Sequence, residues 1–152
     1  MGMAQAWRSS TQFDAERIGA VAIYCSDGRF NEQFDEFLHR SLDLPCYDRL
    51  TVPGGPAALA GHISAHRTED ALEESLAFLV HHHKLERVVL IAHKECGFYL
   101  KKLLFSASDL RRKQEEDLAK AAARVRGMAN LHVDAYFASV GDGRVVIEPV
   151  EV

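Results

Sequence analysis

Short apolar segments alternate with helix-like segments along this chain, and this alternation constrains the fold more than any other feature. Residues 18–25 and 87–92 are nearly uninterrupted apolar runs that contain several β-branched residues. Runs of this length are typical of strands covered on both faces, and they are far too short to span a membrane. The pattern therefore predicts an α/β fold with a mostly parallel sheet flanked by helices.

Turn residues and apolar spacing locate the elements of the first half. Residues 18–25 are the first expected strand, and Asn31 is the expected N-cap of a helix whose apolar residues recur up to residue 42. A second strand is expected at 47–52, because the Pro-Gly-Gly-Pro segment at 53–56 cannot continue a hydrogen-bonded ladder.

The second half is predicted to contain three helices and three strands. The helices are expected at 68–83, 98–105 and 109–127, and the strands at 87–92, 133–140 and 144–150. Gly141-Asp142-Gly143 is a hairpin turn signal, so the C-terminal strand is expected to join the sheet through a hairpin. No repeat or linker divides the chain, and we expect one domain over residues 1–152 with an N-terminal arm at 1–15.

Composition narrows the functional classes. With 22 acidic against 18 basic side chains the formal net charge is −4, which argues against nucleic acid as a partner. Three cysteines cannot form a closed disulfide framework, and residues 1–15 contain no apolar block of the kind found in secretory signals. We therefore expect a cytoplasmic protein with free thiols and with no membrane partner.

Three groups of chemically useful residues directly follow predicted strands. They are Cys25-Ser26-Asp27-Gly28-Arg29, Pro53-Gly54-Gly55 and His93-Lys94-Glu95-Cys96. In an open α/β sheet, the loops at the carboxyl ends of the strands converge on a crevice where the strand order reverses. Residues 68 positions apart, such as Cys25 and His93, are therefore expected to meet.

Cys25, His93 and Cys96 form a candidate zinc site. Two thiolates and one imidazole suit Zn²⁺, which binds sulfur and nitrogen in a tetrahedron. Three protein ligands leave one corner for water, and zinc lowers the pKa of such a water towards about 7. A buried cysteine is more often a packing residue, but the nearby His93 and the Asp27/Arg29 pair favour metal binding.

Asp27 and Arg29 are candidate catalytic residues. They alternate with Cys25, so an extended backbone would project all three side chains to the same side. A carboxylate held by arginine stays ionised and oriented, and it could accept a hydrogen bond from zinc-bound hydroxide. It could instead move onto the metal as a fourth ligand, or the pair could be a structural ion pair at the end of a strand.

The two motifs, Cys25-x-Asp27-x-Arg29 and His93-x-x-Cys96-Gly97, resemble those of the β-class carbonic anhydrases. Their order, their positions after strands and the closing hairpin extend the resemblance from about residue 18 to residue 150. The resemblance implies a short, divergent family member in which Cys25, His93 and Cys96 bind zinc, and in which Asp27 and Arg29 orient the nucleophile. It also implies a lyase that reversibly hydrates carbon dioxide to bicarbonate, and a homodimer or higher homo-oligomer.

The sequence departs from the family pattern where Thr51-Val52-Pro53-Gly54-Gly55-Pro56 replaces an Arg-Asn-Ala-Gly stretch. The substrate could therefore be carbonyl sulfide or carbon disulfide instead, or the chain could be a catalytically silent zinc module. Gly54, Gly55 and Gly97 are candidates for the substrate pocket. The substrate-contacting glutamine and aromatic residues have only candidates: Gln12, Gln33, Phe30 and Tyr99.

The remaining conspicuous residues have simpler interpretations. Cys46 is expected to be a buried packing residue, and His81–His83 to end a helix beside its dipole. His62 and His66 are expected on the surface or at a cap, although either could shuttle protons. The charged residues that follow are expected to form a solvated helix face: Lys101, Lys102, Arg111–Lys113, Glu115, Glu116, Asp117, Arg124 and Arg126.

Overall fold

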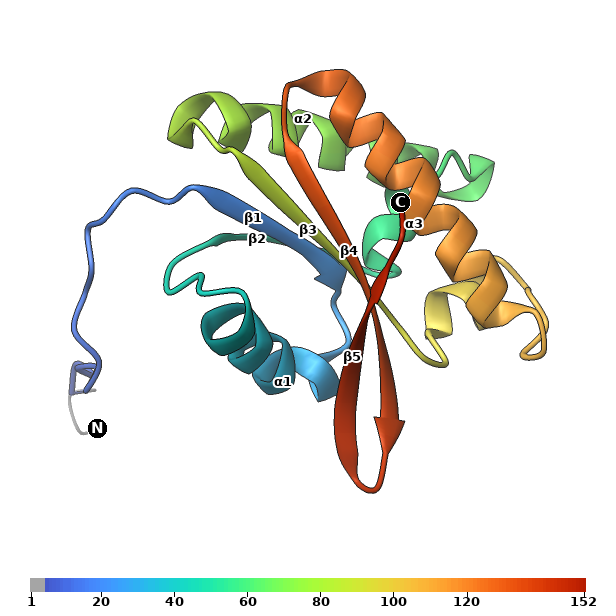
Figure 1. The fold of residues 1–152 in the computed structure, drawn as a ribbon, viewed down its shortest axis with the longest axis horizontal. Coiled ribbons are helices and arrows are strands. Elements are labelled where there is room, and N and C mark those ends of the chain that lie inside the picture. The colour runs from blue at the N-terminus through green and yellow to red at the C-terminus, as the bar shows by residue number, and fades with distance from the viewer. Residues whose placement is uncertain (1–4) are drawn as a thin grey trace.

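The computed structural model describes residues 5–152, which form a five-stranded sheet with helices on both faces (Figure 1). The strands are β1 (Ala20–Cys25), β2 (Asp48–Val52), β3 (Arg87–His93), β4 (His132–Gly141) and β5 (Arg144–Val150). Their spatial order is β2-β1-β3-β4-β5. The first four strands are mutually parallel, and β5 pairs with β4 in antiparallel orientation. The predicted α/β class and the strand added by a hairpin are both confirmed.

The helices divide between the two faces of the sheet (Figure 1). Helix α1 (Asn31–Glu36), continued by the π-helical turn η2 (Phe37–Ser41), covers one face. Helices α2 (His66–His83) and α3 (Leu110–Met128) cover the other. Successive residues of β1 alternate between these two cores, which is why the strand sequence is apolar throughout.

The order of the strands reverses at β1. The chain moves from β1 to β2 on one side and then returns to β3 on the other side of β1. Right-handed crossovers that run in opposite directions place their helices on opposite faces of the sheet. Helices α1 and α2 therefore cover different faces. The loops that follow β1 and β3 therefore diverge, and the space between their carboxyl ends is the expected place for a site.

Most predicted elements are confirmed with shifted ends, but the N-cap assigned to Asn31 is wrong. The 3₁₀ helix η1 (Gly28–Phe30) precedes α1, and the Asp27 side chain caps it. Asn31 is therefore already inside the helical segment. The helix expected at 98–105 is only the short π-helical turn η5 (Phe98–Lys102), because positive φ at Leu104 ends it.

The N-terminal arm expected at 1–15 lies partly outside the described residues, which begin at residue 5. Its described part contains no helix or strand and is exposed, including Trp7 and Phe13. Within residues 5–152, no helix has the length and apolar character needed to cross a membrane.

Candidate metal centre

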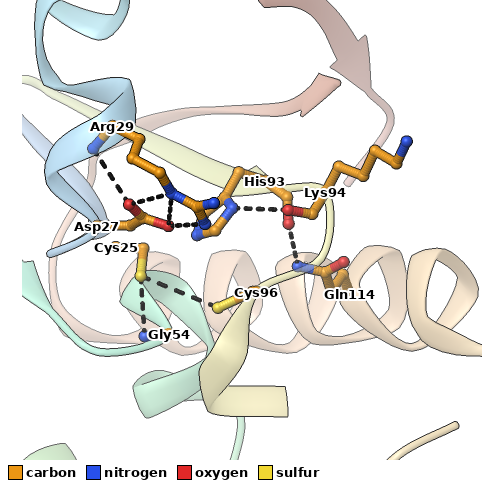
Figure 2. A network of polar contacts seen from close by, with 8 residues as sticks. All are labelled: Cys25, Asp27, Arg29, Gly54, His93, Lys94, Cys96 and Gln114. Atoms are coloured by element: carbon orange, nitrogen blue, oxygen red, sulfur yellow. Dashed lines mark hydrogen bonds and ion pairs between the residues drawn. The ribbon is translucent and has the colours of Figure 1, made fainter. Parts of the chain in front are cut away.

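The structure brings Cys25, His93 and Cys96 together at the carboxyl ends of β1 and β3 (Figure 2). Their ligand atoms all lie within 4.8 Å of one another, and all three residues are buried. The two sulfur atoms are 3.9 Å apart. Two sulfurs each ~2.3 Å from a tetrahedral zinc ion would lie about 3.8 Å apart, so the observed spacing fits zinc.

The ring of His93 is oriented for metal binding. Its Nδ1 donates a hydrogen bond of 2.9 Å to the carbonyl oxygen of Lys94, which can only accept. The proton is therefore on Nδ1, and Nε2 keeps its lone pair. Nε2 is buried and has no hydrogen-bond partner among the described residues. A buried unpaired acceptor is costly, and a metal ion at the two sulfurs would satisfy it.

The thiols of Cys25 and Cys96 shift each other's pKa in opposite directions. The contact with the Cys96 thiol and the backbone N–H groups of Gly54 and Asp27 lower the pKa of Cys25, although burial opposes this shift. The hydrogen bond to Cys25, burial and the charge of Cys25 raise the pKa of Cys96. The two shifts are opposite because the sulfur atoms are in contact, so Cys25 ionises more readily than Cys96. A cation between the sulfurs would stabilise a second thiolate.

Asp27 and Arg29 form a close pair beside this cluster (Figure 2). The Arg29 guanidinium donates to both carboxylate oxygens, with a shortest distance of 2.6 Å, and the Arg29 backbone N–H donates to Oδ1. These contacts lower the pKa of Asp27 to about 2. The carboxylate is therefore ionised and fixed in direction throughout the neutral range.

Asp27 is extended as expected, but Arg29 is not, although the pair itself is present. Strand β1 ends at Cys25, and residues 28–30 turn into η1. Asp27 accepts the Arg29 N–H because it caps this turn, and the same geometry brings the guanidinium within reach.

Gly54 and Gly55 allow the neighbouring chain to approach Cys25 closely. The Gly54 backbone N–H donates to Cys25 Sγ at 3.4 Å. A Cβ on Gly54 would lie 2.5 Å from the Phe98 ring, and one on Gly55 would lie 2.6 Å from the Cys25 backbone nitrogen. Both glycines also have positive φ. Gly97, by contrast, is exposed with open space around it.

A groove of about 710 Å³ opens beside this cluster. It lies between α1, the loop after β3 and the β4–β5 hairpin, and its lining includes Arg29, Phe30, Gln33, Lys94 and Arg144. Phe30 lies between the groove and the metal donors, because its ring centroid is 4.5 Å from that of His93. Gly54, Gly55 and Gly97 are not among the residues that line this groove.

The other candidate substrate contacts occupy different environments. Gln33 lines the groove, and its Oε1 is inaccessible and unpaired among the described residues. Tyr99 is buried, and its hydroxyl donates to Asp117 at 2.6 Å. Gln12 is exposed in the arm.

The structure also places Cys46 and the histidines other than His93 outside the donor cluster. Cys46 is only partly buried, so its assignment to the interior is wrong; it lies in the irregular segment before β2. The ring of His62 contacts Asp117 at 2.6 Å, whereas His66 bonds the Ile63 carbonyl oxygen. Residues 81–83 do end α2.

Two polar residues of α3, Gln114 and Asp117, are buried. The solvated position expected for Asp117 is wrong, because this residue is 2% exposed and bonded to Tyr99 and His62. Gln114 is 1% exposed, and its amide donates to the His93 carbonyl oxygen. Helical spacing could have revealed both, since they share the face that buries Leu110 and Leu118.

Comparison with known proteins identifies the family. The model of the family described as "Putative carbonic anhydrase" matches residues 15–146. The chain belongs to this family. It is a divergent, β-carbonic-anhydrase-like member. This finding confirms the resemblance drawn from the motifs at Cys25 and His93.

Solved structures share the fold at low sequence identity. The β-carbonic anhydrase isoform I of Trichomonas vaginalis superposes with a TM-score of 0.56 at 11% identity, over 92% of this chain and 87% of that chain. The β-carbonic anhydrase CcaA superposes with a TM-score of 0.52 at 14% identity, over 91% of this chain and 85% of that chain. These similarities establish the fold.

Curated relatives in sequence are themselves uncharacterized. An uncharacterized protein of Rickettsia conorii is 27% identical over 102 residues, which are 67% of this chain and 53% of that protein. One of Rickettsia bellii is 25% identical over 96 residues, which are 63% of this chain and 57% of that protein. The chain thus spans little more than half the length of these relatives.

Proposed function

We propose that this chain is a zinc-dependent lyase that reversibly hydrates carbon dioxide to bicarbonate. The observation that carries the proposal is the convergence of Cys25, His93 and Cys96, with the His93 Nε2 lone pair buried and unpaired among the described residues. Membership of the carbonic anhydrase family and the β-carbonic anhydrase fold support the same reaction class.

Cys25, His93 and Cys96 would hold the zinc ion. Zinc held by three protein ligands supplies water activation, because it lowers the pKa of a water ligand to about 7. The surrounding residues keep this region dry: His93 and Cys96 are each 1% exposed, and Phe30 covers the His93 ring. A dry environment strengthens the electrostatic interactions on which the reaction depends.

Asp27 would orient the nucleophile. Its carboxylate can only accept hydrogen bonds when ionised, and Arg29 keeps it ionised. An O–H group of the nucleophile that donates to Asp27 has its lone pair turned away from the carboxylate, towards an incoming carbon dioxide molecule. Formation of the new C–O bond then yields bicarbonate, and the released proton passes to buffer.

Stopped-flow measurement of carbon dioxide hydration by the purified protein tests this function. We expect about one zinc per chain and activity that a strong chelator removes. Cys96→Ala should remove both the zinc and the activity. Cys46→Ala is the matched control, because Cys46 lies outside the donor cluster, and it should retain both. A zinc-loaded wild type without hydration activity from pH 6 to 9 would refute the lyase.

The same protein preparation separates the alternatives. Sulfide release from carbonyl sulfide or carbon disulfide, without carbon dioxide hydration, would indicate the related hydrolase. Zinc binding without either activity would indicate a silent zinc module. The homo-oligomer and the cytoplasmic location stay predictions; mass measurement in solution checks the first.

A further inference from the structure

Two buried polar side chains of α3 contact the segment that carries His93 and Cys96. Among residues 5–152, the buried polar or charged residues are Glu69, His93, Gln114 and Asp117, and Glu69 bonds Gly61 and Arg124 instead. Gln114 and Asp117 lie one turn apart on α3, on the face that also buries apolar residues. Both contact the segment from His93 to Tyr99, which contains two of the three metal donors. Buried polar groups at such a place need a specific reason.

Gln114 holds the beginning of this segment. Strand β3 ends at His93, and the next backbone N–H, of Lys94, still bonds Ala138 in β4. The His93 carbonyl oxygen accepts from Gln114 Nε2 at 2.8 Å, as Figure 2 shows. The peptide that carries the His93 ring is thus fixed from β4 on one side and from α3 on the other.

Asp117 holds the end of the segment. Its Oδ2 accepts from the Tyr99 hydroxyl at 2.6 Å and contacts His62 Nε2 at the same distance. The Tyr99 backbone N–H donates to the Cys96 carbonyl oxygen at 3.1 Å. The position of Tyr99 therefore affects where Cys96 lies relative to the other two donors.

We propose that Gln114 and Asp117 are positioning residues. From α3, on the face of the sheet opposite to α1, they hold His93 and Cys96 at a separation from each other that suits metal binding. The inference rests on the proposed zinc site. Residues that orient metal ligands typically change metal affinity by 10- to 100-fold when they are replaced. Without them the donors must be ordered by the metal itself, and that ordering weakens binding.

Zinc affinity and the absorption spectrum of the Co²⁺-substituted protein test the proposal. Gln114→Met keeps the approximate volume but removes the donor, and we expect about 10- to 100-fold weaker zinc binding in chelator competition. The thiolate-to-cobalt and d–d bands should shift, because they report donor geometry. Gln114→Leu, which also removes the donor, should behave likewise. Asp117→Asn should weaken binding less, since it keeps an acceptor for Tyr99.

Val125→Ala is the matched control. Val125 is fully buried on the same helix, two turns beyond Asp117, in the core between α3 and the sheet. It should loosen α3 without changing the cobalt spectrum. Circular dichroism confirms that each variant is folded, and Gln114→Leu serves if Gln114→Met is not.

The outcomes separate the two proposals. A wild type that binds neither zinc nor cobalt refutes the metal site itself. A wild type that binds zinc tightly, with Gln114 variants of equal affinity and unchanged spectra, refutes only the positioning role. Equal loss in Val125→Ala also refutes it, because the effect would then follow general stability.

Discussion

The two motifs that carry the candidate metal donors differ in what holds them in place. The motif after β1 is stabilised locally: Asp27 caps the following turn and pairs with Arg29, whose side chain is 76% exposed. In the motif after β3, His93 and Cys96 are buried, and the segment is held by residues of α3 that lie 18 to 21 positions later in the chain than their partners. The Asp27–Arg29 contacts of the first motif can therefore be predicted from neighbouring residues, whereas the conformation of the second motif depends on a helix that is distant in sequence.

This difference has consequences for stability. Exposed ion pairs contribute little to the free energy of unfolding, because water and salt screen them. A buried donor or acceptor left without its partner is more costly. We therefore expect substitutions at Asp27 to affect mainly the chemistry, and substitutions around the segment after β3 to affect folding and metal binding together.

Among substitutions that keep Cys25, His93 and Cys96, Asp27→Asn should produce the largest effect on activity. Asparagine can still cap η1, so the fold and zinc content should change little. It cannot serve as an ionised acceptor, and we expect kcat/KM for hydration to fall by about 10²- to 10⁴-fold. Stopped-flow kinetics with metal analysis on the same sample checks this. A loss of zinc that parallels the loss of activity would contradict the orienting role.

Gly54→Ala should have an intermediate effect, and Gly61→Ala is its control. The two glycines have φ of 83° and 80°, but only Gly54 has a neighbour where the Cβ would go. Both variants lose stability because alanine disfavours a positive φ. Gly54→Ala should lose a further ~1–3 kcal/mol from overpacking against Phe98. Denaturant unfolding of the metal-free proteins measures the difference. Equal losses would show that Phe98 moves aside freely.

Glu95→Gly should have the smallest effect, in the stabilising direction. Glu95 and Lys84 both have φ of 54°, one between His93 and Cys96 and the other at the end of α2. Replacing either by glycine relieves the left-handed conformation and should raise stability by up to about 1 kcal/mol. Thermal unfolding of both variants makes the comparison. A gain at Lys84 alone would show that the Glu95 side chain itself supports the turn.

The fold class and the convergence of Cys25, His93 and Cys96 were predictable from the sequence because their signals are local. Apolar runs such as 18–25 indicate covered strands, and a motif directly after a strand lies at the edge of the sheet whatever happens elsewhere. The family motifs then suggested which side chains would meet. The extended backbone expected as far as Arg29 is wrong because the turn that Asp27 caps begins at residue 28.

Sequence alone thus determined the element order and the three side chains, Cys25, His93 and Cys96, that were expected to meet. Tertiary structure alone decided which partners the buried Gln114 and Asp117 contact in the segment after β3, although both belong to a helix rich in charge. The physical reason is that helical periodicity ranks the faces of a helix by polarity, but only packing shows which polar groups have found partners in the interior.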